Sequence, residues 1–212
     1  MKRLLLAGGG QAHVLVLRDI ARRRMPDVEI VVVAPSNQLR YSGMLPGWIA
    51  GHYRVEELTI DLVPLAQAAG AQLVTSHVTK LDLANRIAFT DRGEAFAFDV
   101  LSIATGAEIN VDAIAGAREH ALPLRPFSGF VAGWQHIVQR VAIARDTFRL
   151  TVIGGGAGGA ETALAAAYRA RTMQSPVHVQ LLTGGVPILP GHGHRARLLM
   201  NAALVKNGVQ VT

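Results

Sequence analysis

The chain carries the same glycine-rich run twice, at Gly8-Gly9-Gly10 and at Gly154-Gly155-Gly156. Each run follows a short apolar stretch and precedes a segment rich in alanine or valine. A strand, a tight glycine turn and the start of a helix form a site at which backbone N–H groups and the helix dipole hold a pyrophosphate. Two such turns in one chain predict two bound dinucleotides, and therefore electron transfer from one to the other.

The second run is the more complete of the two. Gly154 permits the tight turn, Gly156 lets the phosphates approach the backbone, and Gly159 lets the helix pack closely on the strand. All three positions of the fingerprint are therefore occupied by glycine in this run.

The first run departs from the fingerprint at its third position. Gly8 and Gly10 fill the first two positions, but His13 stands where the third glycine is expected. The larger side chain predicts either a wider separation of helix and strand or a histidine that contacts the ligand. A packed, hydrogen-bonded histidine is the alternative that involves no ligand.

Both runs lack the acid that binds the ribose hydroxyls at the end of the second strand, about 20 residues on. Ser36 and Asn37 after the first run, and Thr183 after the second, are weaker candidates for this contact. Without a carboxylate the second site does not repel a 2′-phosphate, which Arg195 or Arg197 could contact. NADPH therefore stays open beside NADH.

Other polar residues offer little independent chemistry. Glu161 is expected in the first turn of the second helix, where it either interacts with the helix dipole or contacts the nicotinamide carboxamide. His192 and His194 have no nearby cysteine, aspartate or glutamate, so we predict no metal site. We also predict no catalytic side chain, because in hydride transfer the cofactors carry the chemistry and the protein positions them.

Alternating strand and helix patterns must position these turns, and they predict an α/β fold. We expect strands at 2–7, 29–33, 72–78, 86–90, 95–98, 99–106, 150–153, 177–182 and 208–212. We expect helices at 11–25, 61–69, 131–145, 160–173 and 194–206. Residues 38–53 contain too many helix breakers for one long element. The predicted architecture is two Rossmann-like dinucleotide-binding units (three-layer ββα and βαβ) with an antiparallel β excursion.

Composition narrows the class of protein. Of the 212 residues, 50% are hydrophobic and 17% are charged, which is typical of a globular chain rather than a disordered one. The sequence has no cysteine, so it offers no disulfide, thiolate metal site or thiol redox pair. The net charge is +6, but the arginines are scattered apart from Arg22-Arg23-Arg24 at a predicted helix end, so we expect no nucleic-acid partner. With no secretion signal or transmembrane segment expected, we predict a cytoplasmic protein.

The motifs resemble those of the flavoproteins called pyridine nucleotide-disulfide oxidoreductases. The resemblance rests on the two glycine runs and on Ala104-Thr105-Gly106 after a core strand. Tyr41-Ser42-Gly43-Met44-Leu45-Pro46-Gly47 is most similar to the branch with type II NADH dehydrogenases and the flavoprotein domain associated with selenide, water dikinase. The resemblance implies an FAD-dependent oxidoreductase that passes hydride from NAD(P)H to FAD and electrons on to an unidentified small-molecule acceptor, for which a quinone is one option.

The resemblance also implies which residues contact each cofactor. The FAD pyrophosphate would lie at Gly8, Gly10, Gln11, Ala12 and His13. The adenosine ribose and adenine would lie at Ser36 and Val78, and the isoalloxazine at Met44, Leu45, Pro46, Thr105 and Gly106. NAD(P)H would be held by Gly154, Gly156 and Gly159, with Glu161 at the nicotinamide end.

The resemblance implies a domain division as well. Residues 1–115 would form the N-terminal part of an FAD-binding domain, 116–130 a linker, and 131–212 an incomplete NAD(P)-binding domain. Relatives of this kind continue further, so we expect an N-terminal fragment, with any peripheral membrane contact made by the missing C-terminal part. A homodimer is left open. The alternative function is a non-catalytic flavin- or nucleotide-binding module that partners an enzyme of selenium metabolism.

Overall fold

The computed structural model describes residues 1–144 and 146–212, which form two compact units. Unit 1 comprises Met1–Tyr41 and Thr59–Asn110, and unit 2 comprises Ser42–Leu58 and Val111–Thr212. The region predicted as a first domain, residues 1–115, therefore includes a segment that packs with unit 2. No helix of the described residues is both long and apolar enough to cross a bilayer.

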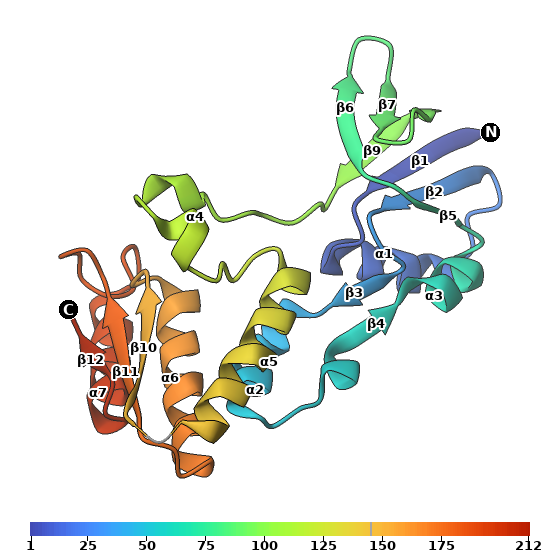
Figure 1. Ribbon diagram of the computed structural model, residues 1–212. Helices are drawn as coiled ribbons and strands as arrows, with labels where there is room; N and C mark the ends of the chain where they lie inside the picture. Colours follow the sequence, from blue (N-terminus) through green and yellow to red (C-terminus); the bar gives the residue numbers. More distant parts are fainter. Residues whose placement is uncertain (145) are drawn as a thin grey trace. The chain divides into compact units, whose positions relative to one another are not determined.

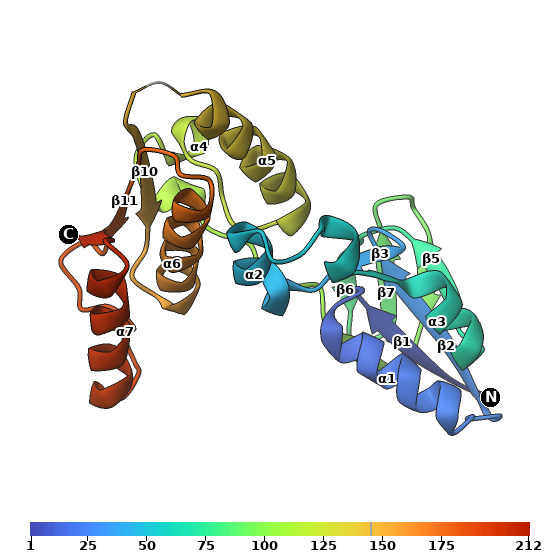
Figure 2. The same cartoon turned by 90° about the horizontal axis from the view of Figure 1, so that it is seen from below.

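Unit 1 is built on a parallel four-stranded sheet with the order β5-β2-β1-β9. Its strands are β1 (Lys2–Ala7), β2 (Val28–Ala34), β5 (Gln72–Thr75) and β9 (Val100–Ile103). One face is covered by the helices α1 (Gln11–Arg22) and α3 (Leu62–Ala69) (Figures 1 and 2). The other face packs on an antiparallel sheet of β6 (Val78–Asp82), β7 (Ile87–Thr90) and β8 (Ala95–Ala97). A short antiparallel pair, β3 (Gln38–Arg40) and β4 (Thr59–Asp61), completes the unit.

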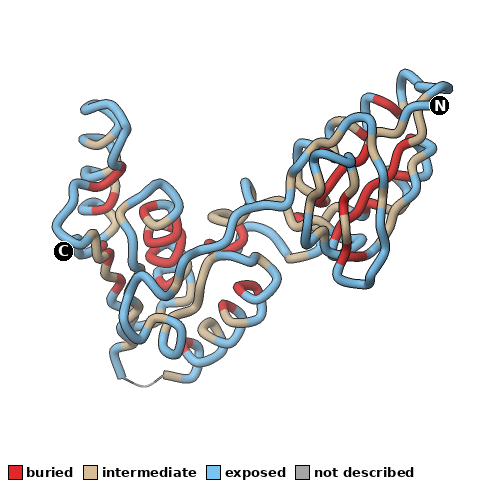
Figure 3. The backbone as a smooth tube through the Cα atoms, turned by 90° about the horizontal axis from the view of Figure 1, so that it is seen from above, coloured by how far each residue is buried: buried red, intermediate tan, exposed pale blue. Residues whose placement is uncertain are grey.

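The central strands of unit 1 are apolar on both faces because both faces are covered. Leu6 and Val32 pack against the helices, whereas Leu5, Val31 and Val33 pack toward β6–β8. Strands buried in this way lose the usual alternation of apolar and polar residues. Burial therefore concentrates along these strands (Figure 3), and the predicted α/β class with an antiparallel excursion is confirmed.

Unit 2 begins a second sheet of the same kind, with the parallel order β10-β11-β12. Its strands are β10 (Phe148–Ile153), β11 (Val177–Leu182) and β12 (Gln210–Val211). Its helices are α2 (Leu45–Ala50), α4 (Ala117–His120), α5 (Phe127–Ile143), α6 (Ala157–Thr172) and α7 (His194–Lys206). Short 3₁₀ turns lie at Ser42–Met44, Val55–Leu58 and Val111–Ala113. Trp48 of α2 and Trp134 of α5 both contact Phe130 within one apolar core.

Several element boundaries differ from those predicted. Helix α6 begins at Ala157 instead of 160, because packing overrides the low helix propensity of its first-turn glycines. Helix α5 begins at Phe127, inside the predicted linker, with Pro126 as its N-cap. Its predicted last residue, 145, lies outside the described residues. The strand predicted at 72–78 is two strands, since β5 ends at Thr75 and β6 begins at Val78.

Helix α6 lies close to the glycine turn that precedes it. A Cβ atom added at Gly159 would overlap the carbonyl oxygen of Gly154. One residue earlier, at Gly158, an added Cβ would meet no atom within 4 Å. The third glycine of the second run is therefore required by packing inside unit 2, as the fingerprint predicts.

We expect Gly159→Ala to lower the free energy of unfolding of unit 2 by about 1–3 kcal/mol, because the methyl group overlaps backbone that must move. Gly158→Ala is the matched control, and it should leave stability unchanged or raise it by up to about 1 kcal/mol through helix propensity. Both tryptophans of the chain lie in the core of unit 2, so their fluorescence during urea unfolding reports on this unit. Equal losses in the two variants would contradict the packing argument.

Candidate dinucleotide sites

The first glycine turn is closed on one side by its own polypeptide. Gly8 has a φ of +98°, and a Cβ atom there would overlap the carbonyl of Ala104. A Cβ atom at Gly10 would lie 2.6 Å from the same oxygen, which accepts a hydrogen bond from the Gly10 N–H at 3.1 Å. The residues after β9 therefore lie directly against this turn, and Thr105 and Gly106 continue from there as exposed residues.

His13 takes the third position of this turn through hydrogen bonds. The residue is 1% exposed. Nδ1 lies 2.6 Å from the Gly8 carbonyl oxygen and Nε2 lies 2.9 Å from the Ser102 hydroxyl. A carbonyl can only accept, so Nδ1 carries a proton, and in the neutral ring Nε2 accepts from Ser102. The structure thus shows the packed, hydrogen-bonded histidine, and a contact of His13 with a pyrophosphate stays a prediction.

The second glycine turn is open where the first is closed. Gly154 has a φ of +111°, and added Cβ atoms at Gly154 and Gly156 would meet no atom within 4 Å. Gly156 is the N-cap of α6, where neither a side-chain cap nor a first-turn acid engages the first amides. Helix α1 likewise has no side-chain cap and no first-turn acid. Such amides need an acceptor from outside the helix, so both turns fit a phosphate group.

Glu161 is placed differently from the prediction. Because α6 begins at Ala157, Glu161 lies in the second turn of the helix and not in the first. The dipole of a helix acts mainly on groups within its first turn. The interpretation of Glu161 as a dipole partner is therefore wrong, and its contact with the nicotinamide end stays a prediction for an exposed side chain.

Neither second strand ends on an acid. After β2, the Ser36 hydroxyl accepts a hydrogen bond from the Gln38 N–H at 3.0 Å. After β11, the Thr183 hydroxyl donates to the Thr212 carbonyl oxygen at 3.2 Å. The described residues also hold no group of three or more histidine, aspartate or glutamate side chains that could bind a metal ion.

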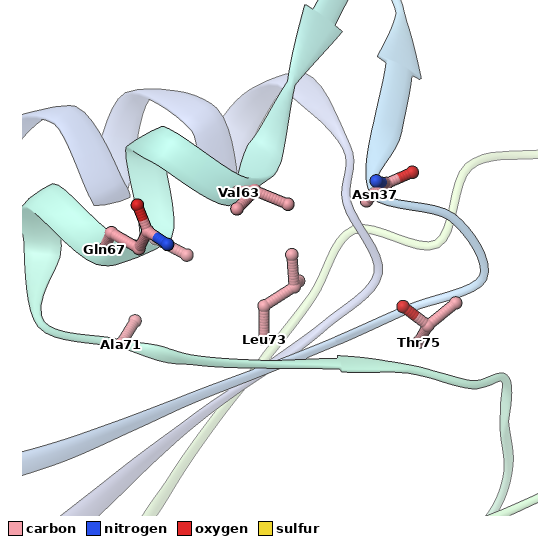
Figure 4. Close-up of a pocket in the computed structure, with 7 residues that line it drawn as sticks. Asn37, Val63, Gln67, Ala71, Leu73 and Thr75 are labelled. Carbon is pink, nitrogen blue, oxygen red and sulfur yellow. The ribbon is translucent and has the colours of Figure 1, made fainter.

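A hollow of about 340 Å³ lies beside the end of β2 in unit 1. Side chains of α3 and β5 face each other across it, including Val63 and Leu73, and Asn37 lies at one end (Figure 4). Asn37 follows Ser36, the residue expected near the adenosine ribose. No residue of the glycine turn lines this hollow, so it adds space beside the expected adenosine end only.

The residues expected near the isoalloxazine fall in both units. Met44 and Leu45 pack partly buried against the core of unit 2, and Pro46 lies in the first turn of α2. Thr105 and Gly106 belong to unit 1. The structure therefore does not bring these residues together within one unit, and their shared role stays a prediction.

The corner before the expected adenine contact, Val78, is held by a carboxylate. Asp91 Oδ1 accepts hydrogen bonds from the Ser76 hydroxyl at 2.5 Å and from the His77 N–H at 2.9 Å. The Ser76 hydroxyl, followed by the His77 N–H, holds the pKa of Asp91 below its usual range. Sequence patterns do not reveal these hydrogen bonds, because Asp91 lies 15 residues from Ser76 and 14 residues from His77.

Comparison with known proteins gives a family for the whole chain. The family described as pyridine nucleotide-disulphide oxidoreductase matches residues 2–212. A NADH dehydrogenase-like protein of Mycobacterium tuberculosis is 26% identical over 225 aligned residues, which cover 99% of this chain and 54% of that protein. The chain thus spans about half the length of the curated relatives it matches.

Solved structures share the fold. The sulfide:quinone oxidoreductase from Aquifex aeolicus superposes with a TM-score of 0.79 and 18% identity, over 100% of this chain and 51% of that one. The water-forming NADH oxidase from Lactobacillus brevis, bound to NADH, gives 0.77 and 18%, over 100% and 46%. The predicted dinucleotide-binding fold and the family resemblance are therefore confirmed.

We expect Ser102→Ala to destabilise unit 1 by about 1–3 kcal/mol, because it leaves a buried ring nitrogen without its donor. Hydrogen exchange of the β1 amides measures this loss. In a chain that already carries His13→Ala, the same substitution should cost much less, since the partner is gone. Equal costs in both backgrounds would show that this hydrogen bond is not the cause.

Acid should loosen the Asp91 corner. Its lowered pKa means that the charged form stabilises the fold, so this contribution is present at neutral pH and is lost as the pH falls below about 4. We expect exchange protection at Ser76 and His77 to fall in that range. Asp91→Asn should reduce the protection at neutral pH and remove its dependence on pH there. Unchanged protection in the variant would contradict the assignment.

Proposed function

The chain belongs to the pyridine nucleotide-disulphide oxidoreductase family, and we propose that it is the nucleotide-binding part of an FAD-dependent NAD(P)H oxidoreductase. Unit 1 would hold FAD at Gly8, Gly10, Gln11, Ala12 and His13, and unit 2 would hold the reduced nicotinamide nucleotide at Gly154, Gly156 and Gly159. One observation carries the proposal: two separate cores each present a strand, a glycine turn and an uncapped helix start.

When bound, the flavin supplies the redox chemistry, because it takes up a hydride from reduced nicotinamide and releases electrons to an acceptor. The chain supplies binding and orientation. In unit 1 the Ala104 carbonyl and the His13 ring fix the turn from the protein side, which leaves the first amides of α1 for the pyrophosphate. In unit 2 the open space at Gly154 and Gly156 admits phosphates from outside.

We take the electron acceptor to be a small molecule, with a quinone as the first class to test. The names of two similar proteins, one NADH dehydrogenase-like and one a sulfide:quinone oxidoreductase, support this choice. The rival function is a module that binds nucleotides without turnover and serves an enzyme of selenium metabolism. Absorbance separates the two, because FAD bound to the protein should bleach on addition of NADH or NADPH and recover with a quinone only in an oxidoreductase.

The second turn can be tested without disturbing the fold. A methyl group at Gly156 meets no protein atom but occupies the space through which phosphates would approach. We expect Gly156→Ala to weaken binding of reduced nicotinamide at least about tenfold. It should lower the free energy of unfolding by only about 0.5–1.5 kcal/mol, because alanine is a poorer N-cap residue than glycine and the added methyl group meets no protein atom.

Gly158→Ala, in the same open stretch but within the helix, is the control for this test. Nicotinamide fluorescence measures binding, and tryptophan fluorescence during urea unfolding measures stability. Retained binding in Gly156→Ala would remove the second turn from the site. Failure of the unsubstituted chain to bind either NADH or NADPH would overturn the proposed function itself.

A further inference from the structure

Strand β9 lies at the edge of the sheet in unit 1 and, in the part of the chain that the structure describes, is paired on one side only. Its partner is β1, in a register that runs from Leu4 and Val100 to Ala7 and Ile103. Two of its side chains add little packing, because Val100 is 56% exposed and Ile103 is 59% exposed. A segment with few buried contacts opens easily. The end of β9 therefore needs further contacts to keep a fixed position.

The position of that strand end matters for the proposed FAD site. Thr105 and Gly106, which are expected beside the isoalloxazine, follow β9 almost directly, and both are exposed. Gly106 adopts a φ of +87°, and an added Cβ atom there would meet no atom within 4 Å. The last close contact with the glycine turn is made by the Thr105 nitrogen, which would lie 2.6 Å from a Cβ atom at Gly8. Where these two residues lie is therefore decided by how the residues just before them are held.

Hydrogen bonds of two kinds hold the strand end to β1 and its glycine turn. The main chain supplies the first kind. The Gly10 N–H donates to the Ala104 carbonyl oxygen at 3.1 Å, and the Ala104 N–H donates to the Ala7 carbonyl oxygen at 2.8 Å. A side chain supplies the second kind, because the Ser102 hydroxyl donates to His13 Nε2 at 2.9 Å. The residues just before Thr105 are thus held at two points.

His13 connects the second of these points to the turn itself. Its Nδ1–H donates to the Gly8 carbonyl oxygen at 2.6 Å. His13 is also the third residue of α1, whose first two residues, Gln11 and Ala12, are expected at the pyrophosphate. A buried hydrogen-bond network in which each member is satisfied holds its members in one arrangement. One ring therefore joins the helix start, the first glycine of the turn and the end of β9.

From these contacts we propose that His13 is a positioning residue for the flavin ring, because through Ser102 it holds the residues after β9 in place beside the pyrophosphate turn. The inference rests on the proposed function, since it assumes that unit 1 binds FAD. In this role His13 acts through Ser102 and needs no contact with the isoalloxazine. Loss of the Ser102 hydrogen bond should leave the phosphate end of the site nearly unchanged and should disturb the ring end.

The test examines the two ends of the cofactor separately in the 212-residue chain loaded with FAD. We expect Ser102→Ala to weaken FAD binding by less than about threefold, because the amides at the turn keep their place. The visible circular dichroism of the bound flavin, which reports on how the ring is held, should fall several-fold. Ser102→Thr keeps the hydroxyl and should restore the signal.

Two further variants show whether His13 is the partner that matters. His13→Asn keeps a donor for the Gly8 carbonyl but is too short to reach Ser102, so it should behave as Ser102→Ala does. Combining the two substitutions should change nothing further, because they remove the same hydrogen bond. Thr90→Val is the matched control. It removes another buried hydroxyl of unit 1, which accepts from the Glu94 N–H at 3.2 Å, and it should leave the circular dichroism unchanged.

The outcomes distinguish this inference from the proposed function. Unchanged circular dichroism in Ser102→Ala, with FAD bound, overturns the inference and leaves the oxidoreductase proposal intact. An equal loss of signal in Thr90→Val also overturns the inference, because general loss of stability would then be the cause. If Ser102→Ala does not fold, as judged by hydrogen exchange of the β1 amides, His13→Asn decides in its place. Failure of the unsubstituted chain to bind FAD overturns the proposed function and the inference together.

Discussion

Both units depend on how a helix approaches the carbonyl oxygen of the first glycine in its turn. In unit 2 the approach is so close that Gly159 has no room for a Cβ atom against Gly154. In unit 1 a histidine stands at the same position and donates a hydrogen bond to the Gly8 carbonyl. The Gly154 carbonyl thus has room beside it only because Gly159 lacks a side chain, whereas the Gly8 carbonyl accepts a hydrogen bond from the His13 ring. In each case the protein-facing side of the turn is fixed, and only the other side is left for a ligand.

The glycines of the two turns differ in how closely other atoms of the protein approach them. The first is braced by Ala104, so its glycines are needed for contact between β1, α1 and the end of β9 before any ligand is considered. The second has open space at Gly154 and Gly156 and is braced by the loop after β11 through Leu189. A substitution at Gly10 would therefore disturb the packing of the turn as well as ligand binding, so its two effects could not be told apart. A substitution at Gly156 would change ligand binding without a clash inside the protein. Glycine can thus be required for different physical reasons at equivalent positions of the two turns.

Much of the fold follows from local pattern. Strands β1 and β11 and helix α7 lie where the apolar runs and glycine signals place them, since each is bounded by strong breakers. The missed boundaries depend on contacts distant in sequence. Helix α6 extends back over glycines of low propensity because the turn holds them. Ser42–Leu58 joins unit 2 because Trp48 packs on Phe130, more than 80 residues away.

The candidate sites, like the fold, have features that local sequence predicts and features that depend on contacts distant in sequence. The glycine turns are local motifs, so spacing alone locates them. The residues that hold them cannot be found by spacing: Ser102 reaches His13 across 89 positions, and Leu189 reaches Gly155 from a different loop. A departure from the motif, such as His13, is for this reason a poor sign of lost function. The position requires only that the carbonyl of the first glycine be satisfied at short range. A buried imidazole meets that requirement as well as a glycine does, because the Gly8 carbonyl fixes its tautomer and the Ser102 hydroxyl satisfies its other nitrogen.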